Sequence, residues 1–387
     1  MDPLPVEVPK VARRHGANRA WIRARSWFAP WSVVLVAASL YLAIIVATRG
    51  GDPLALATLG TRFSEGDPAG TEGYDGQFAY YIARDPLGGW RHCDVPAYRY
   101  QRILYPLLAR LLAFGQESLL PYTLPLLNLA ALAAGTWLTE QILRRHGMSR
   151  WYALTYGLYA GQLMAVRLNL NEPLSFALVQ AAILAAERGR WRWSVPLFAL
   201  AALTRETALV FVAGYLLALL LRRDWARAAA LALGAGLPFL AWQAILWTWF
   251  GRPGLGSGGA GATGWEIVPF RGLWSVGAID LHALALLALV MVPLAVVPAL
   301  LGLWAAGRDL WRGRRQPVVA MLLANALIIL FLPQSTFREP LAMLRLTSGL
   351  MVATINYGAT RRSHRILNYS LLWLASLVFV LKEGGGT

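Results

Sequence analysis

The sequence has little charge and almost no cysteine for its length. Charged residues make up 14 % of 387 residues and apolar residues 57 %, whereas a soluble globular domain has about 25 % charged residues. The single cysteine, Cys93, excludes an internal disulfide, and nothing resembles a zinc or redox motif built from paired cysteines. We therefore expect an integral membrane protein that folds without disulfides.

About eleven apolar segments predict transmembrane helices, although several are shorter than the roughly 20 residues that cross a bilayer. We expect an all-α polytopic fold of about 11 transmembrane helices, with residues 1–387 forming a single membrane domain. The predicted segments are 31–48, 119–143, 151–167, 172–187, 193–204, 207–221, 226–249, 281–306, 317–333, 340–357 and 366–382.

Basic clusters separate these segments in alternation and contain most of the 36 Lys and Arg. The positive-inside rule places the N-terminal segment 1–30 in the cytoplasm and the C-terminus outside. This distribution explains the net charge of +16, so no nucleic acid partner is expected. The clusters are Lys10 to Arg25, Arg144 to Arg150, Arg188 to Arg192, Arg222 to Arg227, Arg308 to Arg315 and Arg361 to Arg365.

Two long loops are then expected on the outer side. The first, 49–118, contains EGYDGQFAYYIARDPLGGWRHCDVPAYRYQRILYP, and its apolar stretch Ile103 to Phe114 is only about 18 Å long as a helix, which favours an interfacial position. The second, 251–280, opens with GRPGLGSGGAGATG, and its glycine density predicts a flexible segment. A lid over a binding site and a plain connector both fit this second loop.

Two polar turns are expected below the outer surface. Segment 193–221 must cross twice with few residues, so its turn, Thr204 to Thr207, should lie at depth, and the turn Asn169 to Pro173 is placed similarly. Non-helical backbone is tolerated there only where it is buried in protein or lines a cavity. We predict a polar cavity that opens outward beneath the first loop.

Asp75 is the candidate chemical centre of the first loop. It lies in GYDGQ, where the flanking glycines allow the backbone to approach a ligand closely, and its carboxylate could deprotonate a hydroxyl nucleophile. An equally good interpretation is that Asp75 caps the helix expected from Gln77 to Arg84.

Arg99 and Arg102 lie one helical turn apart in YRYQR, and paired guanidinium groups suit a phosphate. Headgroup anchoring, or ion pairs with the acids of the same loop, explains them equally well. We interpret Asp94, like Asp52 and Asp67, as a solvated loop charge. The run His92-Cys93-Asp94 is a weak metal signal, because adjacent side chains point in different directions.

Several charged residues are expected at membrane depth, where a charge is costly and is often functional. Four of them lie in or just before the two polar turns, and for these a purely structural network of ion pairs is the alternative. Near the segment that begins at Pro340, Arg338 and Arg345 approach one face, and Arg345 should pair with Glu339 or a lipid phosphate. The four residues in and before the polar turns are Arg167, Glu172, Arg205 and Glu206.

The motifs GYDGQFAYYIARDP and YRYQRILYPLLARLLAFG resemble those of the GT-C superfamily of integral-membrane glycosyltransferases, with weaker support from NEP at 171–173 and TRETAL at 204–209. The bacterial mannosyltransferase-like and arabinosyltransferase-like branches are the most similar. The layout of one helix followed by a long outward loop is also similar.

The resemblance implies that a hexosyl or pentosyl group moves from a polyprenyl-phosphate donor to an envelope glycan, lipid or protein acceptor. Transfer would occur on the outer face of the bacterial cytoplasmic (inner) membrane, with Asp75 as general base. The donor phosphate would be bound by Arg99, Arg102, Arg205, Arg338 and Arg345. The sugar or acceptor would be bound or oriented by Tyr74, Gln77, Tyr80, Tyr98, Asn171, Glu172 and Glu206.

The chain departs from the superfamily members that bind a divalent metal through paired acids, because Gly76 follows Asp75. No metal ligand is predicted, and dependence on Mg²⁺ or Mn²⁺ stays an open alternative. A transporter or flippase of lipid-linked sugars, and an O-antigen-ligase-like enzyme, are the competing functions. A transporter should tolerate Asp75→Asn, whereas the enzyme should not.

Overall fold

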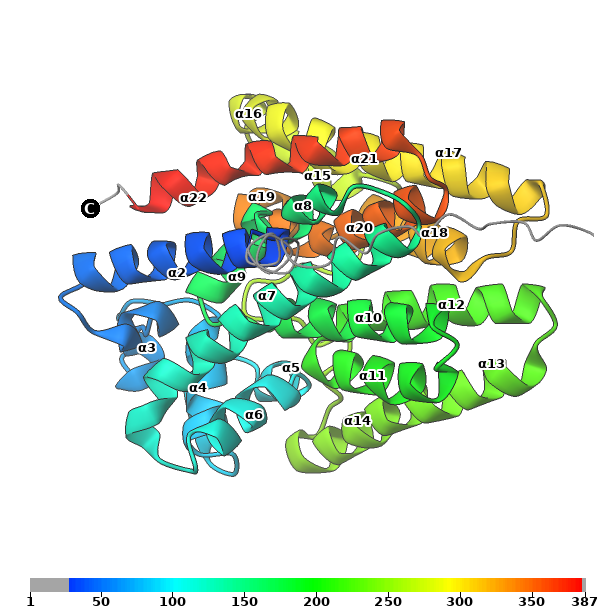
Figure 1. Cartoon of the computed structure of the whole chain (residues 1–387). Helices are drawn as coiled ribbons and strands as arrows, with labels where there is room; N and C mark the ends of the chain where they lie inside the picture. The colour runs from blue at the N-terminus through cyan, green and yellow to red at the C-terminus, as the bar shows by residue number, and fades with distance from the viewer. Residues whose placement is uncertain (1–27, 385–387) are drawn as a thin grey trace, which may run out of the picture.

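The structure, a computed structural model, describes residues 28–384, and every regular element in that range is a helix (Figure 1). The predicted cytoplasmic segment 1–30, with its basic cluster, falls almost wholly outside the described residues. Helices occupy all the apolar segments expected from the sequence. The all-helical prediction is therefore confirmed for the described part of the chain.

The first long loop, 49–118, contains several short helices. One of its α-helices ends at Tyr100, and the next one, Leu104–Leu112, corresponds to the expected interfacial stretch. The helix that follows Asp75 ends at Arg84, because Pro86 disfavours a helical conformation for Asp85. In chain order the elements are α2 (Pro30–Thr48), α3 (Thr61–Ser64), α4 (Gly76–Arg84), α5 (Pro96–Tyr100), α6 (Leu104–Leu112) and α7 (Leu120–Arg145).

The middle of the chain forms a packed group of helices, in which α10 lies against both α7 and α11. The expected segment 151–167 is two helices rather than one. At the break, the backbone N–H of Ala160 donates to Ser376 Oγ at 3.2 Å. The elements are α8 (Ala153–Gly157), α9 (Ala160–Arg167), α10 (Glu172–Glu187), α11 (Trp191–Thr204), α12 (Leu209–Leu221), α13 (Trp225–Leu231) and α14 (Leu237–Phe250).

The C-terminal part covers this group, with α18 packed against α12, α17 and α20. The second long loop, 251–280, contains one short helix, α15. The elements are α15 (Arg271–Gly277), α16 (Leu281–Met291), α17 (Val297–Trp311), α18 (Pro317–Leu330), α19 (Gln334–Arg338), α20 (Pro340–Thr360), α21 (His364–Ser370) and α22 (Leu377–Gly384).

Four helical stretches of the described chain are long and apolar enough to cross a membrane: Pro30–Thr48, Glu117–Arg145, Trp225–Phe250 and Leu287–Trp311. Much of their apolar surface faces outward; only 17 % of the most apolar stretch of α2 is buried. The apolar helices indicate a lipid bilayer environment. The number of crossings stays a prediction, because α11 and α12 have 14 and 13 residues.

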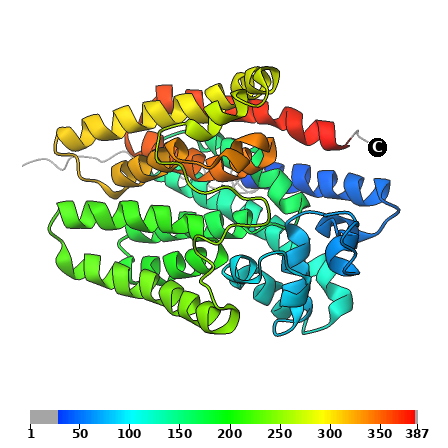
Figure 2. The ribbon, with the colours of Figure 1, turned by 180° about the vertical axis from the view of Figure 1, so that it is seen from behind.

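The two ends of the helical bundle carry different kinds of connecting segments. The turns between α12 and α13 and between α17 and α18, both rich in arginine, lie at one end of the molecule in Figure 1 and in the reverse view of Figure 2. The short helices α3, α4 and α6 of the first loop lie toward the other end. The basic clusters that the structure describes and the first loop are therefore separated by the length of the helices.

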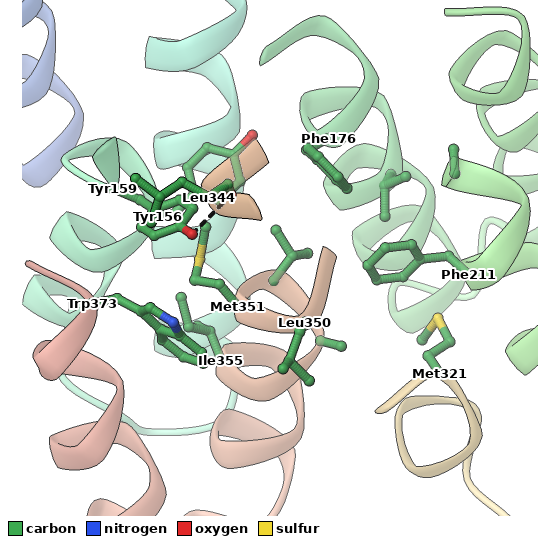
Figure 3. Close-up of a cluster of buried hydrophobic side chains, with 14 of the residues drawn as sticks. Tyr156, Tyr159, Phe176, Phe211, Met321, Leu344, Leu350, Met351, Ile355 and Trp373 are labelled. Carbon is green, nitrogen blue, oxygen red and sulfur yellow. Dashed lines mark hydrogen bonds between the residues drawn. The ribbon is translucent and has the colours of Figure 1, made fainter. Parts of the chain in front are cut away.

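A cluster of buried side chains joins α20 to α8, to the residue before α9 and to the segment before α22. Tyr156, Tyr159, Met351 and Trp373 pack together (Figure 3). The hydroxyl of Tyr159 donates to the carbonyl oxygen of Leu344 at 2.8 Å, drawn as a dashed line in Figure 3. Because Arg345 follows Leu344 in α20, this contact also fixes the position from which the Arg345 side chain extends.

Candidate functional site

A small cavity lies where the first loop meets the ends of α9, α10 and α20. Its wall includes four charged side chains and two asparagines, and the space that they enclose is small. A cavity with polar walls is thus present beneath the first loop, as expected, and its opening toward the outer side stays a prediction. Its wall consists of Asp75, Phe78, Ala79, Ile82, Arg99, Arg102, Pro106, Asn169, Leu170, Asn171 and Arg345.

Asp75 is held between two arginines. Its Oδ1 accepts from Arg99 Nη1 at 2.9 Å and its Oδ2 from Arg345 Nη1 at 2.8 Å. Asp75 occupies the N-cap position of α4, yet its side chain makes no capping hydrogen bond. Burial by itself would raise the pKa of Asp75, but Arg99 and Arg345 outweigh burial and hold the pKa well below the usual range of a carboxyl.

Arg99 is fixed from behind by Asp94. Two parallel hydrogen bonds of 2.7 Å join its Nε and Nη2 to the Asp94 carboxylate, and its guanidinium lies 4.1 Å from the ring centroid of Phe78. The interpretation of Asp94 as a solvated loop charge is wrong, since its side chain is buried against Arg99. Asp94 instead orients the arginine that contacts Asp75.

Arg345 is held by Glu172, and not by the expected Glu339. Its Nε donates to Glu172 Oε1 at 2.5 Å, and Arg205 Nη1 lies 2.6 Å from the same oxygen. Glu339 accepts instead from the Tyr74 hydroxyl at 2.6 Å. A fully buried carboxylate shared by two guanidinium groups is a rigid anchor for both arginines.

Arg102 forms a separate pair with Glu206 of the α11–α12 turn. Its Nη2 and Nε donate to the two carboxylate oxygens at 2.5 and 2.8 Å. Its Nη2 also donates to the Tyr98 hydroxyl at 2.7 Å, and the Tyr98 ring lies under the guanidinium. The two polar turns expected at depth therefore both meet the first loop here.

These pairs leave the site neutral when every group is ionised. Asp75 is the most exposed of the carboxylates, at 29 % of its side chain, against 5 % for Asp94, 16 % for Glu206 and 0 % for Glu172. An entering anion must therefore share an arginine with a carboxylate or replace one, and Asp75 is the easiest to replace. The groups are Arg99, Arg102, Arg205 and Arg345 with Asp75, Asp94, Glu172 and Glu206.

Close backbone packing brings Asp75 to this position. A side chain at Gly76 would overlap the carbonyl group of Leu168 at the end of α9, so only glycine allows α4 to start there. The next residue, Asn169, has a left-handed backbone with φ of 52° and lines the cavity. The flanking glycine of the GYDGQ motif thus has a packing role at the cavity.

The second long loop, 251–280, lies against the far side of Asp94. The backbone N–H of Ala260 donates to Asp94 Oδ2 at 2.9 Å. The start of the loop is tied to α14, because Gln243 Oε1 accepts from the N–H groups of Gly254 and Leu255 at 2.8 and 2.9 Å. The loop therefore borders the arginine cluster.

Of the other predicted site residues, some lie beside the arginines and some do not. Tyr74 and Tyr98 lie beside the arginines, with the Tyr74 ring centroid 5.8 Å from Arg345 Cζ. Gln77 is buried and bonds the loop backbone at Gly60 and Glu72, and Tyr80 packs in an apolar cluster. Arg338 is exposed at the end of α19 and does not line the cavity.

The run His92-Cys93-Asp94 does not converge on a point. His92 Nδ1 lies 2.7 Å from the carbonyl oxygen of Phe63, while Asp94 faces Arg99. Burial raises the pKa of the Cys93 thiol to about 12, so it is protonated at neutral pH. Among the described residues, no group of three or more His, Cys, Asp or Glu is placed to hold a metal ion.

Comparison of the chain with protein-family models, with curated proteins and with solved structures found no match.

Proposed function

We propose that the protein is a GT-C-type glycosyltransferase. It would move a hexosyl or pentosyl group from a polyprenyl-phosphate donor to an envelope glycan, lipid or protein acceptor, with Asp75 as general base. The observation that carries the proposal is the position of Asp75 in the cavity, with one carboxylate oxygen on Arg99 and the other on Arg345. Two guanidinium groups that converge on one oxyanion also suit a phosphate.

The donor phosphate would take over the two arginines from Asp75. A phosphodiester carries one negative charge and can accept from both guanidinium groups. Asp94 and Glu172 would meanwhile keep Arg99 and Arg345 in place, because their hydrogen bonds use other guanidinium nitrogens. The exchange adds one negative charge to the neutral cluster and leaves the carboxylate of Asp75, the most exposed of the four acids, without its two arginine partners.

This exchange would activate the base. While Arg99 and Arg345 face Asp75, the pKa of its carboxyl is too low for efficient proton abstraction from a hydroxyl. When the phosphate shares the arginines, the carboxylate loses their field and its pKa rises. Asp75 would therefore become a competent base only in the complex with the donor.

In the transfer step, the acceptor hydroxyl oxygen attacks the anomeric carbon and its proton passes to Asp75. The bond between the anomeric carbon and the phosphate oxygen breaks, and the lipid phosphate leaves with the bonding electrons. Arg99 and Arg345 would neutralise the charge that develops on the leaving phosphate. Arg102 and Arg205 would stay paired with Glu206 and Glu172 during this step.

The proposed orientation places this cavity on the outer face of the bacterial inner membrane. The basic clusters would lie in the cytoplasm and the two long loops outside. The second loop, in contact with Asp94, would cover the acceptor side of the cavity.

The test is sugar transfer by the purified protein from polyprenyl-phosphate sugars to membrane or glycan acceptors. Wild type should transfer, and Asp75→Asn should lose about 10²–10⁴-fold in rate. Asp67→Asn, at an exposed aspartate of the same loop, is the matched control and should keep full activity. Equal rates for wild type and Asp75→Asn would remove Asp75 from the mechanism.

A transporter of lipid-linked sugars is the main alternative. It would need the arginines to bind phosphate but would not need a base. Transport of donor across vesicle membranes that Asp75→Asn leaves intact, without transfer to any acceptor, would favour it.

A further inference from the structure

The backbone conformation at position 169 partly explains why asparagine occurs there. It follows α9 with a left-handed backbone, φ of 52°, and its N–H donates to Val166 O at 3.3 Å, while the N–H of Leu170 donates to Ala165 O at 2.8 Å. This is a Schellman-type helix end, in which glycine is the commonest residue and asparagine the next choice. The turn explains the backbone, but glycine would satisfy it without a polar side chain.

The side chain of Asn169 is buried and has no hydrogen-bond partner in the described part of the chain. The residue is 1 % exposed and lines the cavity with Asp75 and Arg345. Neither its Oδ1 nor its Nδ2 has a hydrogen-bond partner among the described residues. A buried amide with both polar atoms unsatisfied is destabilising and calls for a functional explanation.

Asn128 shows what a structural amide looks like in the same region. It is fully buried, and its Nδ2 donates to the Tyr105 hydroxyl at 2.9 Å and to the Leu170 carbonyl at 2.7 Å. Those bonds tie α7 to the turn that carries Asn169. The Oδ1 of Asn128 has no partner among the described residues either, so the two asparagines differ at the amide nitrogen, which is bonded twice in Asn128 and not at all in Asn169.

We propose that the Asn169 amide binds a pair of neighbouring hydroxyl groups of the donor sugar, which rests on the proposed function. The amide oxygen accepts from one hydroxyl and the amide nitrogen donates to the other, the combination that a neutral vicinal diol offers. The charged groups of the cavity wall are engaged in ion pairs. Asn171, whose buried Oδ1 also has no partner among the described residues, lies two residues further along the same wall.

The test compares two lipids, a polyprenyl-phosphate hexose and bare polyprenyl phosphate, binding to wild type and to Asn169→Gly. Glycine keeps the left-handed turn and removes only the amide. The variant should bind the sugar-bearing lipid about tenfold more weakly and bare polyprenyl phosphate equally well, because the lost bonds go to the sugar. Its thermal stability should match or exceed that of wild type.

Asn169→Asp, which keeps the shape but loses the donor, is a second variant and should also lower the preference for the sugar-bearing lipid. Asn128→Ala is the control and should lower thermal stability without changing that preference.

If Asn169→Gly and Asn169→Asp bind both lipids as wild type does, the amide does not contact the sugar and the inference is overturned, while the proposed function stands. If wild type binds neither lipid, the proposed function fails and the inference fails with it. A loss of stability in Asn169→Gly with an unchanged preference would assign the amide to the fold.

Discussion

At the scale of single residues, Asp75 is the group on which the site depends. It is more exposed than the other carboxylates of the cluster and holds two arginines, each of which has a second acidic partner. Removing its charge therefore leaves neither Arg99 nor Arg345 without a carboxylate. We expect substitutions at Asp75 to change chemistry and anion affinity more than folding.

The depressed pKa of Asp75 predicts a specific pH dependence of stability. A carboxyl whose pKa is lower in the folded state stabilises the fold above its unfolded pKa, about 3.9, and this contribution is lost as the pH falls toward the folded pKa. The difference in melting temperature between wild type and Asp75→Asn should be constant from about pH 8 to pH 5 and shrink below about pH 4. A difference that already shrinks between pH 7 and pH 5 would show that the pKa is not depressed.

Glu172 should matter for the fold itself. Its carboxylate is fully buried and pairs with both Arg205 and Arg345, so Glu172→Gln leaves excess positive charge inside the protein. We expect a loss of about 3 kcal/mol or more in the free energy of unfolding, measured by denaturant or thermal unfolding in detergent. Glu339→Gln, at an exposed acid bonded only to the Tyr74 hydroxyl in this structure, is the control. Equal stability of the two variants would contradict the buried network.

The local motifs were sufficient to find Asp75, Arg99 and Arg102, because these residues lie close together in one loop. They were not sufficient to find their partners. Arg345 lies 270 positions from Asp75 in the sequence, so no local pattern could pair the two. The prediction that Glu339 is the partner of Arg345 was therefore wrong. Asn169 was missed because its signal is a buried amide without partners, which only three-dimensional packing reveals.

At the scale of elements, apolar runs located the helices well. The apolar side chains of each run must be buried in protein or face lipid along the whole helix. These runs did not locate the break between α8 and α9. At that break the N–H of Ala160 bonds to Ser376, a contact from the other end of the chain that local sequence does not reveal. Sequence also left the second outward loop open between a lid and a connector, and the structure shows only that it lies against Asp94.

Gln243 should control the second loop. Its buried Oε1 accepts two backbone hydrogen bonds from the start of the loop, at Gly254 and Leu255, each worth about 1 kcal/mol. Gln243→Leu should expose the segment 251–280 and increase its cleavage in limited proteolysis several-fold. Thr248→Val, at an exposed site of the same helix, should leave the cleavage rate unchanged. Equal cleavage in both variants would show that Gln243 does not hold the loop.

At the scale of the whole molecule, the described basic turns gather at one end of the helices and the first loop at the other (Figures 1 and 2). The alternation of basic and other loops along the sequence predicted this separation, because a helix that crosses the membrane places the loops at its two ends on opposite sides. Sequence could not predict which short helices complete a crossing. Lengths of 13 and 14 residues for α12 and α11 do not decide it.

The orientation can be tested by cysteine labelling in a Cys93→Ser background. A cysteine introduced by Glu65→Cys, in the exposed part of the first loop, should react with a membrane-impermeant maleimide in intact cells. One introduced by Arg312→Cys, in the α17–α18 turn, should react only after permeabilisation. The reverse pattern would place the cavity on the cytoplasmic side and remove the proposed location of transfer.

The most direct test of the central claim is the affinity of wild type and Asp75→Asn for bare polyprenyl phosphate, measured by titration at constant pH and salt. If the phosphate takes Arg99 and Arg345 from Asp75, removing the competing carboxylate should strengthen binding by about tenfold, or about 1.4 kcal/mol, although the same variant is inactive in transfer. Weaker or unchanged binding by Asp75→Asn would contradict the exchange of anions at these two arginines.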